Sequence, residues 1–379
     1  MTILFLLAFL LLIILTFKRP KSVKLLLFWI IIFYIISVYS KQAADYLNYL
    51  IQYDKINLGV QEYEPLYRLL VQIGGKLGLS YDGFKAIITI FQAALIVWII
   101  KHYTDNVALA FMLFLIYPLH IQAFLTRYFI GFVLVLLATH IYLKKKNILA
   151  YYILIVMAAL CHNSLLFFAC LPILMRDNIK KTTLCVLAVF CGFLLISSLN
   201  LMNIVGKLFI TDEVKYNALF SEMPTLFFVW KSIIKQFLLL APTFIIICYL
   251  YNRYEQSCCC LSLESSCRAP AETSRQFFSR FILQINILSC LVPIFQTYSH
   301  GFERLYYFMD FFNCIFFAQL VAHVPRKGQK KHMVYICIAG YCVYKLFRYY
   351  VLGSDGARDD LWHTLYGNQI FSLILGSPE

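Results

Sequence analysis

Long apolar runs separated by short polar segments recur from one end of this chain to the other. Several runs are shorter than the ~20 residues that a straight membrane span needs, so flanking residues must complete them. The runs are Ile3–Phe17, Val23–Val38, Phe84–Ile100, Val107–Phe124, Phe129–Leu143, Ile148–Leu160, Leu165–Leu174, Leu184–Leu199, Leu226–Leu250, Phe281–Phe295, Leu305–Val324 and Met333–Val351. The pattern predicts an all-α integral membrane protein with about twelve transmembrane helices, organised as a single polytopic membrane domain over residues 1–379.

One part of the pattern does not fit a simple span. The stretch between Lys146 and Arg176 is long for one membrane crossing and short for two. A single crossing would place Lys180-Lys181 and the Arg326–Lys331 cluster outside, against the tendency of basic loops to stay in the cytoplasm. We therefore predict a short helical hairpin with His162-Asn163-Ser164 at its tip, an arrangement tolerated where it lines a cavity enclosed by protein.

A second short apolar stretch, Leu66–Leu79, is interrupted by glycines and by basic residues. It is too short and too polar to cross the membrane, and it favours an interfacial or re-entrant helix on the outer side. Glu64-Pro65 directly before it suits a helix start, since an acid near the N-terminus and a proline in the first turn are both favourable.

Composition agrees with this pattern. Hydrophobic residues make up 61% of the chain and charged residues 14%, and the mean hydropathy is +0.75. A soluble domain is nearer half apolar and one quarter charged, so no sizeable soluble domain is expected. The net charge of +14 could indicate nucleic-acid binding in a soluble protein. Here Lys and Arg cluster in short loops between apolar runs, which is typical of cytoplasmic loops, and we expect no nucleic-acid partner.

The distribution of charge sets the predicted orientation. Basic clusters such as Lys18–Lys21, Lys144–Lys146 and Arg326–Lys331 fall in one alternate set of loops, and most acids fall in the other. The basic set is then cytoplasmic and both termini are extracytoplasmic. The segments predicted outside the membrane are outer loops 40–65 and 200–225, cytoplasmic loop 251–276 and an extracytoplasmic tail, 353–379.

Basic residues on the outer side are candidate phosphate ligands. Arg127 and Arg304 each stand where a helix starts at the outer face, and Lys231 follows the long outer loop. A guanidinium can bind phosphate with two parallel hydrogen bonds, helped by backbone N–H groups at a helix N-terminus. The alternative is an interfacial side chain that extends to lipid headgroups.

His162, Asp45 and Glu64 are the candidate general bases. A histidine well inside the bilayer is unfavourable unless it faces a partner or water, and such a group can take a proton. It could equally be a satisfied packing residue. Acids and aromatic residues outside the membrane suit sugar recognition, and they also suit an ordinary solvated loop; Tyr49 and Tyr67 are the aromatic candidates there.

Some common chemistries lack support in the sequence. The chain has no P-loop glycine signature, no His-Glu-x-x-His helix and no Gly-x-Ser-x-Gly elbow. Cysteines 258, 259, 260 and 267 lack the Cys-x-x-Cys pairs that metal sites favour. We expect no metal site and no cofactor.

Three motifs together resemble the EpsG family of membrane polysaccharide polymerases, relatives of the Wzy-type O-antigen and capsule polymerases. Asp45-Tyr46-Leu47-Asn48-Tyr49 with Glu64-Pro65-Leu66-Tyr67 looks like that family's first outer loop. Leu125–Gly131 resembles its arginine helix start, although Tyr128 stands where Gln is usual. Ala158–Leu165 resembles its Phe-His-x-Ser-Ala segment, with Cys161 in place of Phe. More loosely, Arg304 with Tyr306 and Tyr307 is similar to a late arginine motif.

The resemblance implies a polymerase in the bacterial cytoplasmic (inner) membrane that needs no cofactor. It would join oligosaccharide repeat units carried on undecaprenyl diphosphate into O-antigen, capsule or exopolysaccharide, outside the membrane. The residue roles are our own inference: Arg127, Arg304 and Lys231 would bind the diphosphate, and Tyr49, Tyr67 and Tyr306 would bind the sugars. His162, Asp45 or Glu64 would act as base. A chain-length regulator in the membrane is a further candidate partner. A flippase of lipid-linked sugars and a membrane acyltransferase remain the alternatives.

Overall fold

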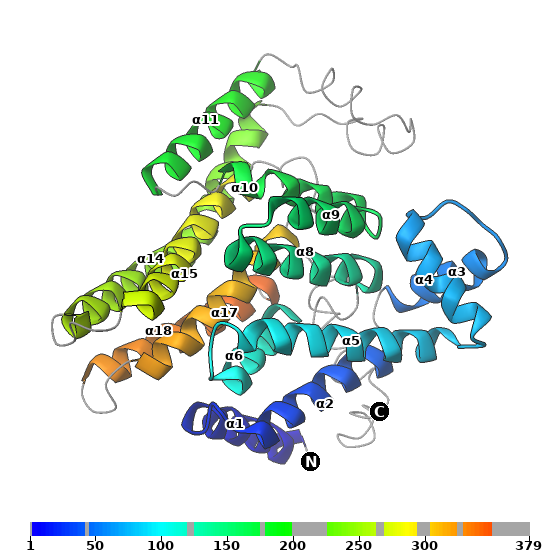
Figure 1. Ribbon diagram of the computed structural model, residues 1–379, viewed down its shortest axis with the longest axis horizontal. Helices are drawn as coiled ribbons and strands as arrows, with labels where there is room; N and C mark the ends of the chain where they lie inside the picture. Colours follow the sequence, from blue (N-terminus) through cyan, green and yellow to red (C-terminus); the bar gives the residue numbers. More distant parts are fainter. Residues whose placement is uncertain are drawn as a thin grey trace. The chain divides into compact units, whose positions relative to one another are not determined.

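The computed structural model describes residues 2–41, 45–119, 125–174, 179–198, 226–262, 269–293, 304–323 and 329–350. Every regular element in these ranges is a helix (Figure 1). The chain divides into two compact units, residues 1–169 with 314–379 and residues 170–313. Each unit is described by itself below.

The first unit contains helices from both ends of the chain. It holds α1 (Thr2–Lys18), α2 (Val23–Tyr39), α3 (Tyr46–Asn57), α4 (Pro65–Lys76), α5 (Tyr81–Lys101), α6 (Val107–Phe114), the π-helical turn η1 (Leu115–Leu119), α8 (Thr126–Lys145), α9 (Ile148–Ala159), most of the 3₁₀ segment η2 (Asn163–Cys170), the second part of α17 (Leu305–His323) and α18 (Gln329–Tyr350). Helix α8 lies between α5 and α9, and α2 packs on α5 and α6 (Figure 1).

The second unit holds α10 (Leu171–Leu174), α11 (Ile179–Ser198), α14 (Leu226–Ser262), α15 (Ala269–Leu288), η3 (Ser289–Leu291) and the start of α17. Helix α15 packs against both α11 and α14. Much of the segment predicted as cytoplasmic loop 251–276 is helical, because α14 continues to Ser262 and α15 begins at Ala269. The predicted outer loop 200–225 and the tail 353–379 lie outside the described residues.

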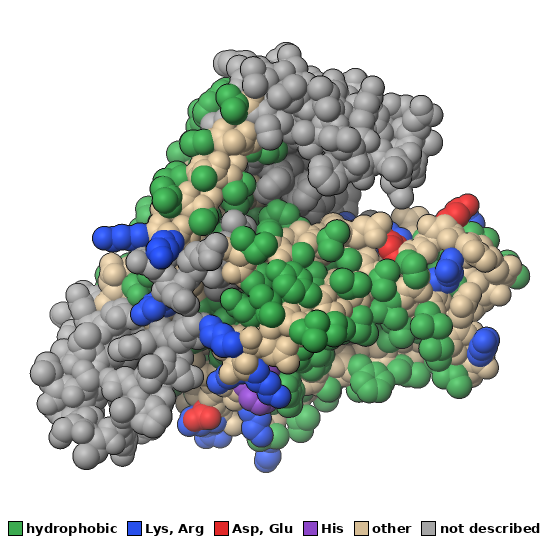
Figure 2. Space-filling model, turned by 45° about the horizontal axis from the view of Figure 1, so that its top comes forward, with side chains coloured by type: hydrophobic (Ala, Val, Ile, Leu, Met, Phe, Trp, Pro, Cys, Tyr) green, Lys and Arg blue, Asp and Glu red, His purple; other side chains and the backbone are tan. Residues whose placement is uncertain are grey.

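Four helical stretches in the described ranges are long and apolar enough to cross a bilayer. They are Tyr81–Lys101, Thr126–Lys145, Ile233–Asn252 and Leu305–Ala322. Shorter apolar helices accompany them, including Val23–Tyr39 and Ile148–Ala159. Large apolar side chains such as Ile90 and Phe91 of α5 are exposed, and hydrophobic side chains are spread over the described part of the face in Figure 2. This is the surface of a membrane protein; twelve crossings and outward termini stay predictions.

Polar side chains inside the first unit pair across helices. The Trp29 indole N–H of α2 donates to the Thr16 hydroxyl of α1 over 3.0 Å, and Ser37 of α2 and Thr89 of α5 share a hydrogen bond of 3.0 Å. All four side chains are buried. Where water is excluded, such groups must find partners within the protein. These bonds therefore fix α1, α2 and α5 together.

The outer loop predicted for residues 40–65 contains a helix that the sequence analysis missed. Helix α3 (Tyr46–Asn57) buries Tyr49, Tyr53 and Ile56, which recur on one helical face. Its exposed face mixes Leu47 and Ile51 with polar residues such as Asp54 and Lys55, so no long apolar run marks the segment. Packing of the tyrosine face against α4 and α5 stabilises it.

The short helix predicted over Leu66–Leu79 is confirmed as α4. Pro65 stands at its first position, where the missing N–H removes no hydrogen bond. The helix ends at Lys76, and Gly78 follows with φ +70°, a conformation that favours glycine. Tyr67, Val71 and Gly74 form its buried face, toward α3 and α5.

The chain reverses within Ile148–Leu174, as a hairpin requires. Helix α9 ends at Ala159, and the 3₁₀ segment η2 begins at Asn163. The Tyr151 hydroxyl donates to the carbonyl oxygen of Phe168 over 2.5 Å. In one straight helix these residues would lie about 25 Å apart. The turn at residues 160–162 therefore carries His162 to the tip of a short helical pair.

Candidate functional site

Arg127 and Glu64 form an ion pair that joins two segments 63 positions apart in sequence. Arg127 lies in the first turn of α8, and Glu64 precedes α4. The Arg127 Nη1 donates to Glu64 Oε2 over 2.9 Å, with side chains 23% and 13% exposed. The guanidinium lies 6.0 Å from the ring centre of Tyr63. Such a half-buried pair is held more firmly than a surface pair.

The pair leaves part of the guanidinium available. Arginine carries five N–H donors in a planar fork, and one of them is bonded to Glu64. The Nε of Arg127 is buried and has no hydrogen-bond partner among the residues that the structure describes. A buried donor without a partner is unfavourable, so this group suits an anionic or carbonyl ligand.

The carbonyl oxygen of Leu160 holds α4 in this position. It accepts the backbone N–H of Leu66 over 2.9 Å and that of Tyr67 over 3.4 Å. The first N–H groups of a helix and the last carbonyls of a helix have no partner within their own helix. Here the start of α4 and the end of α9 satisfy each other. Because Leu160 is two residues before His162, this contact brings the start of α4 to the hairpin tip.

His162 contacts the same start of α8 that carries Arg127. Its ring lies edge-on to the ring of Tyr128, with centroids 5.4 Å apart. Its Nδ1 shares a hydrogen bond of 2.8 Å with the Ser164 hydroxyl, and the side chain is half-buried. When Nδ1 carries the proton and donates to Ser164, the Nε2 has a lone pair that can accept a proton.

Gly131 permits the close packing of α8 on the hairpin tip. A methyl group at this position would lie 2.8 Å from the carbonyl oxygen of Ala158 and 3.2 Å from the Cβ of Cys161. It would also overlap the Leu165 side chain. Gly131 is four residues after Arg127, on the same face of the helix. The glycine therefore sets the distance between the arginine and the histidine segments.

We expect Gly131→Ala to destabilise the protein by about 1–3 kcal/mol, because overpacking a tight contact forces the backbone apart. The measurement is the midpoint of thermal unfolding of the detergent-purified protein. Gly192→Ala in α11 is the matched control, since a methyl group there meets nothing within 4 Å. Equal midpoints for the two variants would contradict the close-packing role of Gly131.

Tyr49 and Tyr67 lie within an aromatic cluster that also includes Tyr53 and Tyr81. Tyr49 is 7% exposed and Tyr67 fully buried, so neither ring offers an open face for a sugar in this conformation. The Tyr67 hydroxyl is buried without a hydrogen-bond partner among the described residues. Burial raises the pKa of this hydroxyl above its usual value, which keeps it neutral and able to donate.

Asp45 belongs to a neighbouring polar cluster rather than to the ion pair. It precedes α3, where its side chain makes no capping hydrogen bond. Nearby Asp82 accepts a hydrogen bond of 2.7 Å from the Tyr46 hydroxyl and pairs with Lys41 at 2.9 Å. Burial, followed by the hydrogen bond and charge of Asp82, raises the pKa of Tyr46. Both aspartates act electrostatically on Lys85.

Lys85 is a feature of this region that the sequence analysis missed. It is 3% exposed, and its Nζ lies 5.8 Å and 6.0 Å from the ring centres of Tyr46 and Tyr81. The Tyr81 hydroxyl shares a hydrogen bond of 3.1 Å with Thr126, the residue before Arg127. The sequence did contain a signal for Lys85, since it is a lysine one turn inside an apolar span. Charges inside the membrane are rare unless they have a function or a partner.

The remaining predicted site residues belong to the second unit. Arg304 is half-buried directly before α17, Tyr306 is 1% exposed and Lys231 is exposed on α14. They are therefore not part of the site formed by Arg127, Glu64 and His162, which all lie in the first unit. Within the described ranges no three His, Cys, Asp or Glu side chains gather where they could hold a metal ion. The side chains of cysteines 258, 259, 260 and 267 lie outside the described residues.

The three sequence motifs thus converge on one place in the first unit. Glu64 and the start of α4, Arg127 and the start of α8, and the hairpin tip with His162 are joined by an ion pair, two backbone hydrogen bonds and a ring contact. No curated protein and no solved structure matches the chain significantly. A family model, that of the EpsG family, matches residues 23–357, most of the chain. The chain belongs to the EpsG family, whose members are Wzy-like polymerases.

Proposed function

We propose that this protein is a membrane glycosyltransferase that joins oligosaccharide repeat units carried on undecaprenyl diphosphate into a surface polysaccharide. The reaction would take place at the extracytoplasmic side of the bacterial cytoplasmic membrane, which the protein crosses many times. The observation that carries the proposal is the Arg127–Glu64 pair beside His162, because a diphosphate ligand and a proton acceptor are what such a transfer needs.

Arg127 would bind the diphosphate of the donor. In the transfer, the bond between the anomeric carbon and the diphosphate oxygen breaks, and the lipid diphosphate leaves with the electron pair. Negative charge therefore grows on the leaving group in the transition state. A guanidinium already held in place by Glu64 stabilises that charge without reorganisation, which is how preorganised donors accelerate a reaction.

His162 would take the proton of the attacking hydroxyl. The acceptor is the non-reducing end of a new repeat unit, and its oxygen forms the new bond to the anomeric carbon of the growing chain. A positioned base that removes the proton in the transition state contributes roughly 10²–10⁴-fold. The contact of His162 with Tyr128, next to Arg127, supports this assignment over Asp45, which lies in the Lys85 cluster.

Glu64 would then orient Arg127 rather than act as base. Tyr67, whose buried hydroxyl has no described partner, would donate to a sugar or phosphate oxygen. Arg304 and Lys231 remain proposed phosphate ligands, and Tyr306 and Tyr49 remain proposed sugar ligands. The energy of transfer is stored in the lipid diphosphate, so the scheme requires neither nucleotide nor metal. A chain-length regulator is the protein partner that we propose.

Deletion of the gene for this protein in its native host tests the proposal directly. We expect surface glycan with single repeat units on the lipid acceptor in place of a ladder of long chains, and restoration by the wild-type chain. The measurement is gel analysis of the extracted glycan. A normal chain-length distribution in the deletion strain would refute the polymerase assignment.

Two other outcomes would point to the alternative functions. A flippase predicts lipid-linked units that accumulate on the cytoplasmic side and no single units at the surface. An acyltransferase predicts long chains of normal length that lack acyl groups. Neither result is compatible with a polymerase.

A further inference from the structure

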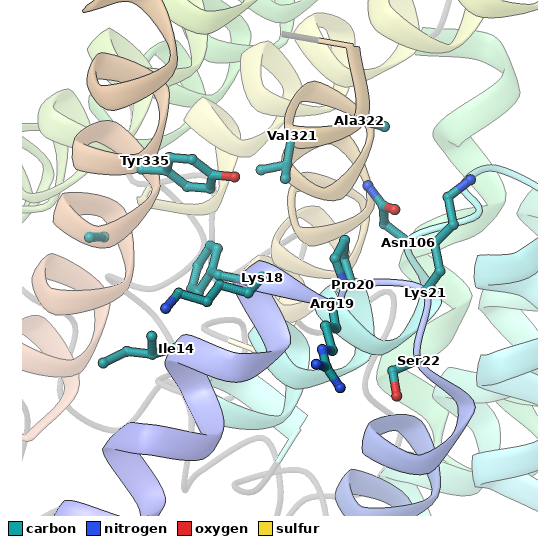
Figure 3. A pocket seen from close by; sticks show the side chains of 12 residues that line it. Ile14, Lys18, Arg19, Pro20, Lys21, Ser22, Asn106, Val321, Ala322 and Tyr335 are labelled. Carbon is teal, nitrogen blue, oxygen red and sulfur yellow. The ribbon is translucent and has the colours of Figure 1, made fainter. Parts of the chain in front are cut away.

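A pocket of about 1010 Å³ opens in the first unit, away from the Arg127 site. It lies between the turn that joins α1 to α2, the N-terminal end of α6 and the facing parts of α17 and α18 (Figure 3). Its lining changes from basic at the turn to apolar along the helices. This division into a charged end and an apolar end gives the pocket the character of a site for an amphiphile.

Three cations form the basic end. Lys18, Arg19 and Lys21 line the pocket within a single turn, and all three are exposed. Lys21 pairs with Asp105 at 3.2 Å, but the two side chains are 66% and 81% exposed. A pair so open to solvent is weak, so a phosphate can replace the carboxylate at little loss. Lys18 and Arg19 form no ion pair within the part of the chain that the structure describes.

Apolar side chains from three helices form the other end. Ile14 and Phe17 come from α1, Val321 from α17, and Ala339 from α18. Phe17 contacts the ring of Tyr335 edge-on, with centroids 5.6 Å apart. Ala339 is small and exposed where α18 lines the pocket. A hydrocarbon chain is the complement of such walls.

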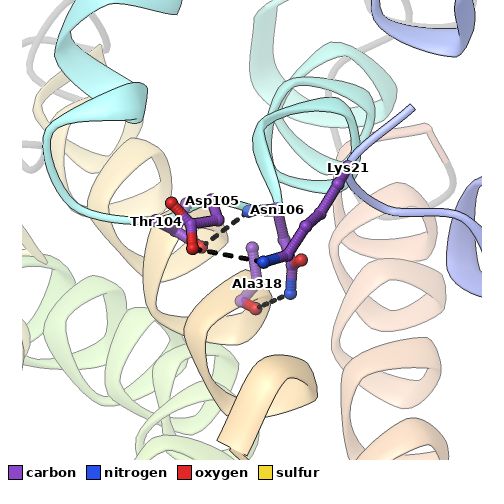
Figure 4. Close-up of polar contacts among 5 residues, drawn as sticks. All are labelled: Lys21, Thr104, Asp105, Asn106 and Ala318. Atoms are coloured by element: carbon purple, nitrogen blue, oxygen red, sulfur yellow. Dashed lines mark hydrogen bonds and ion pairs between the residues drawn. The ribbon is translucent and has the colours of Figure 1, made fainter. Parts of the chain in front are cut away.

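Polar contacts hold the wall of the pocket in place before any ligand binds. Asn106 is 2% exposed, and its Nδ2 donates to the carbonyl oxygen of Ala318 over 2.8 Å (Figure 4). Its backbone N–H donates to the Thr104 hydroxyl over 3.1 Å. One residue beyond Ala318, the Gln319 amide donates to the carbonyl oxygen of Tyr103 over 2.6 Å. These bonds fix the start of α6 to α17, so the cavity is preformed.

We propose that this pocket binds one anionic phospholipid, with the phosphate at the turn that carries Lys18, Arg19 and Lys21 and an acyl chain along α1, α17 and α18. Charge complementarity selects the headgroup, and basic pockets between membrane helices are suited to anionic lipids. The loop of these cations belongs to the basic set predicted to face the cytoplasm, where a headgroup of the inner leaflet lies at the same level.

The lipid site is separate from the proposed catalytic site. Arg127 lies near the Tyr81 end of α5, through the bond between Tyr81 and Thr126. The pocket lies beyond the Lys101 end, at Asn106. A helix of this length spans roughly 30 Å. A lipid bound here would therefore brace α1, α17 and α18 at the opposite membrane face without touching the reacting groups.

Binding to the full chain, purified in a neutral detergent, tests the proposal. The probes are dioleoyl-phosphatidylglycerol and dioleoyl-phosphatidylcholine, and native mass spectrometry counts the bound lipids. We expect one phosphatidylglycerol per chain, bound at least tenfold more tightly than phosphatidylcholine. The double variant Lys18→Gln/Arg19→Gln should weaken phosphatidylglycerol binding roughly 25-fold, since each cation near an anionic headgroup contributes about a factor of five.

Two matched variants separate a built pocket from general charge attraction. Lys145→Gln/Lys146→Gln removes two exposed cations from another basic turn and should leave binding unchanged. Ala339→Trp keeps every cation but fills the apolar end, and should weaken phosphatidylglycerol binding at least tenfold. Equal loss in the two double variants would overturn the proposal, as would equal affinity of the wild type for both lipids. Displacement of the lipid by glycerol 3-phosphate, with binding intact in Ala339→Trp, would overturn it in favour of a soluble phosphate.

Discussion

Arg127→Lys should lower the rate of polymer formation by roughly 100- to 1000-fold while the protein still accumulates in the membrane. Loss of one donor from a charge-stabilising site has an effect of that size. Lysine keeps the charge and three N–H donors but lacks the planar fork, so it cannot reproduce the geometry in which the guanidinium meets Glu64 and a phosphate oxygen. The measurement is the chain-length ladder of the surface glycan at matched expression, where loss on this scale removes the long chains.

Arg68→Lys is the control for this experiment. Arg68 lies on α4, four residues after Glu64, and its Nη1 donates to the carbonyl oxygen of Gln61 in an exposed position. An arginine that only makes a surface contact should tolerate lysine, and we expect a wild-type ladder. A wild-type ladder from Arg127→Lys as well would remove the diphosphate role from Arg127.

His162→Gln should reduce polymer formation by roughly 10²–10⁴-fold, the range for loss of a general base. Glutamine preserves much of the volume and can still bond to Ser164, but it cannot take a proton at neutral pH. The ladder should again collapse to single units, with normal abundance of the protein. An assay in isolated membranes, supplied with lipid-linked repeat units, measures the rate of polymer formation directly.

Ser164→Ala provides the comparison for His162. It removes the hydrogen bond that orients Nδ1 and leaves the base in place, so we expect a loss of tenfold or less, about the value of one neutral hydrogen bond. If His162→Gln retained polymerisation while Asp45→Asn or Glu64→Gln abolished it, the base would be a carboxylate.

Several parts of the fold follow from local pattern. Apolar runs predict the spanning helices such as α5 and α8, because a bilayer requires long apolar segments with satisfied backbone groups. Pro65 and Gly78 mark the ends of α4 through their backbone preferences. The hairpin follows from a length that suits neither one span nor two. Helix α3 was missed because its buried face is made of tyrosines within a polar segment.

The candidate site, like the fold, was predicted from the sequence only in part. The sequence by itself determined the class of protein and the family motifs. It also predicted Glu64, Arg127 and His162 as candidate site residues, since each is a polar group in or beside an apolar segment. Only the tertiary structure decided that Glu64 pairs with Arg127, that Leu160 anchors α4, and that Lys85 is enclosed by tyrosines. Such contacts join segments far apart in sequence. They arise from the need of buried charges and helix ends for partners, and no local pattern specifies which partner that will be.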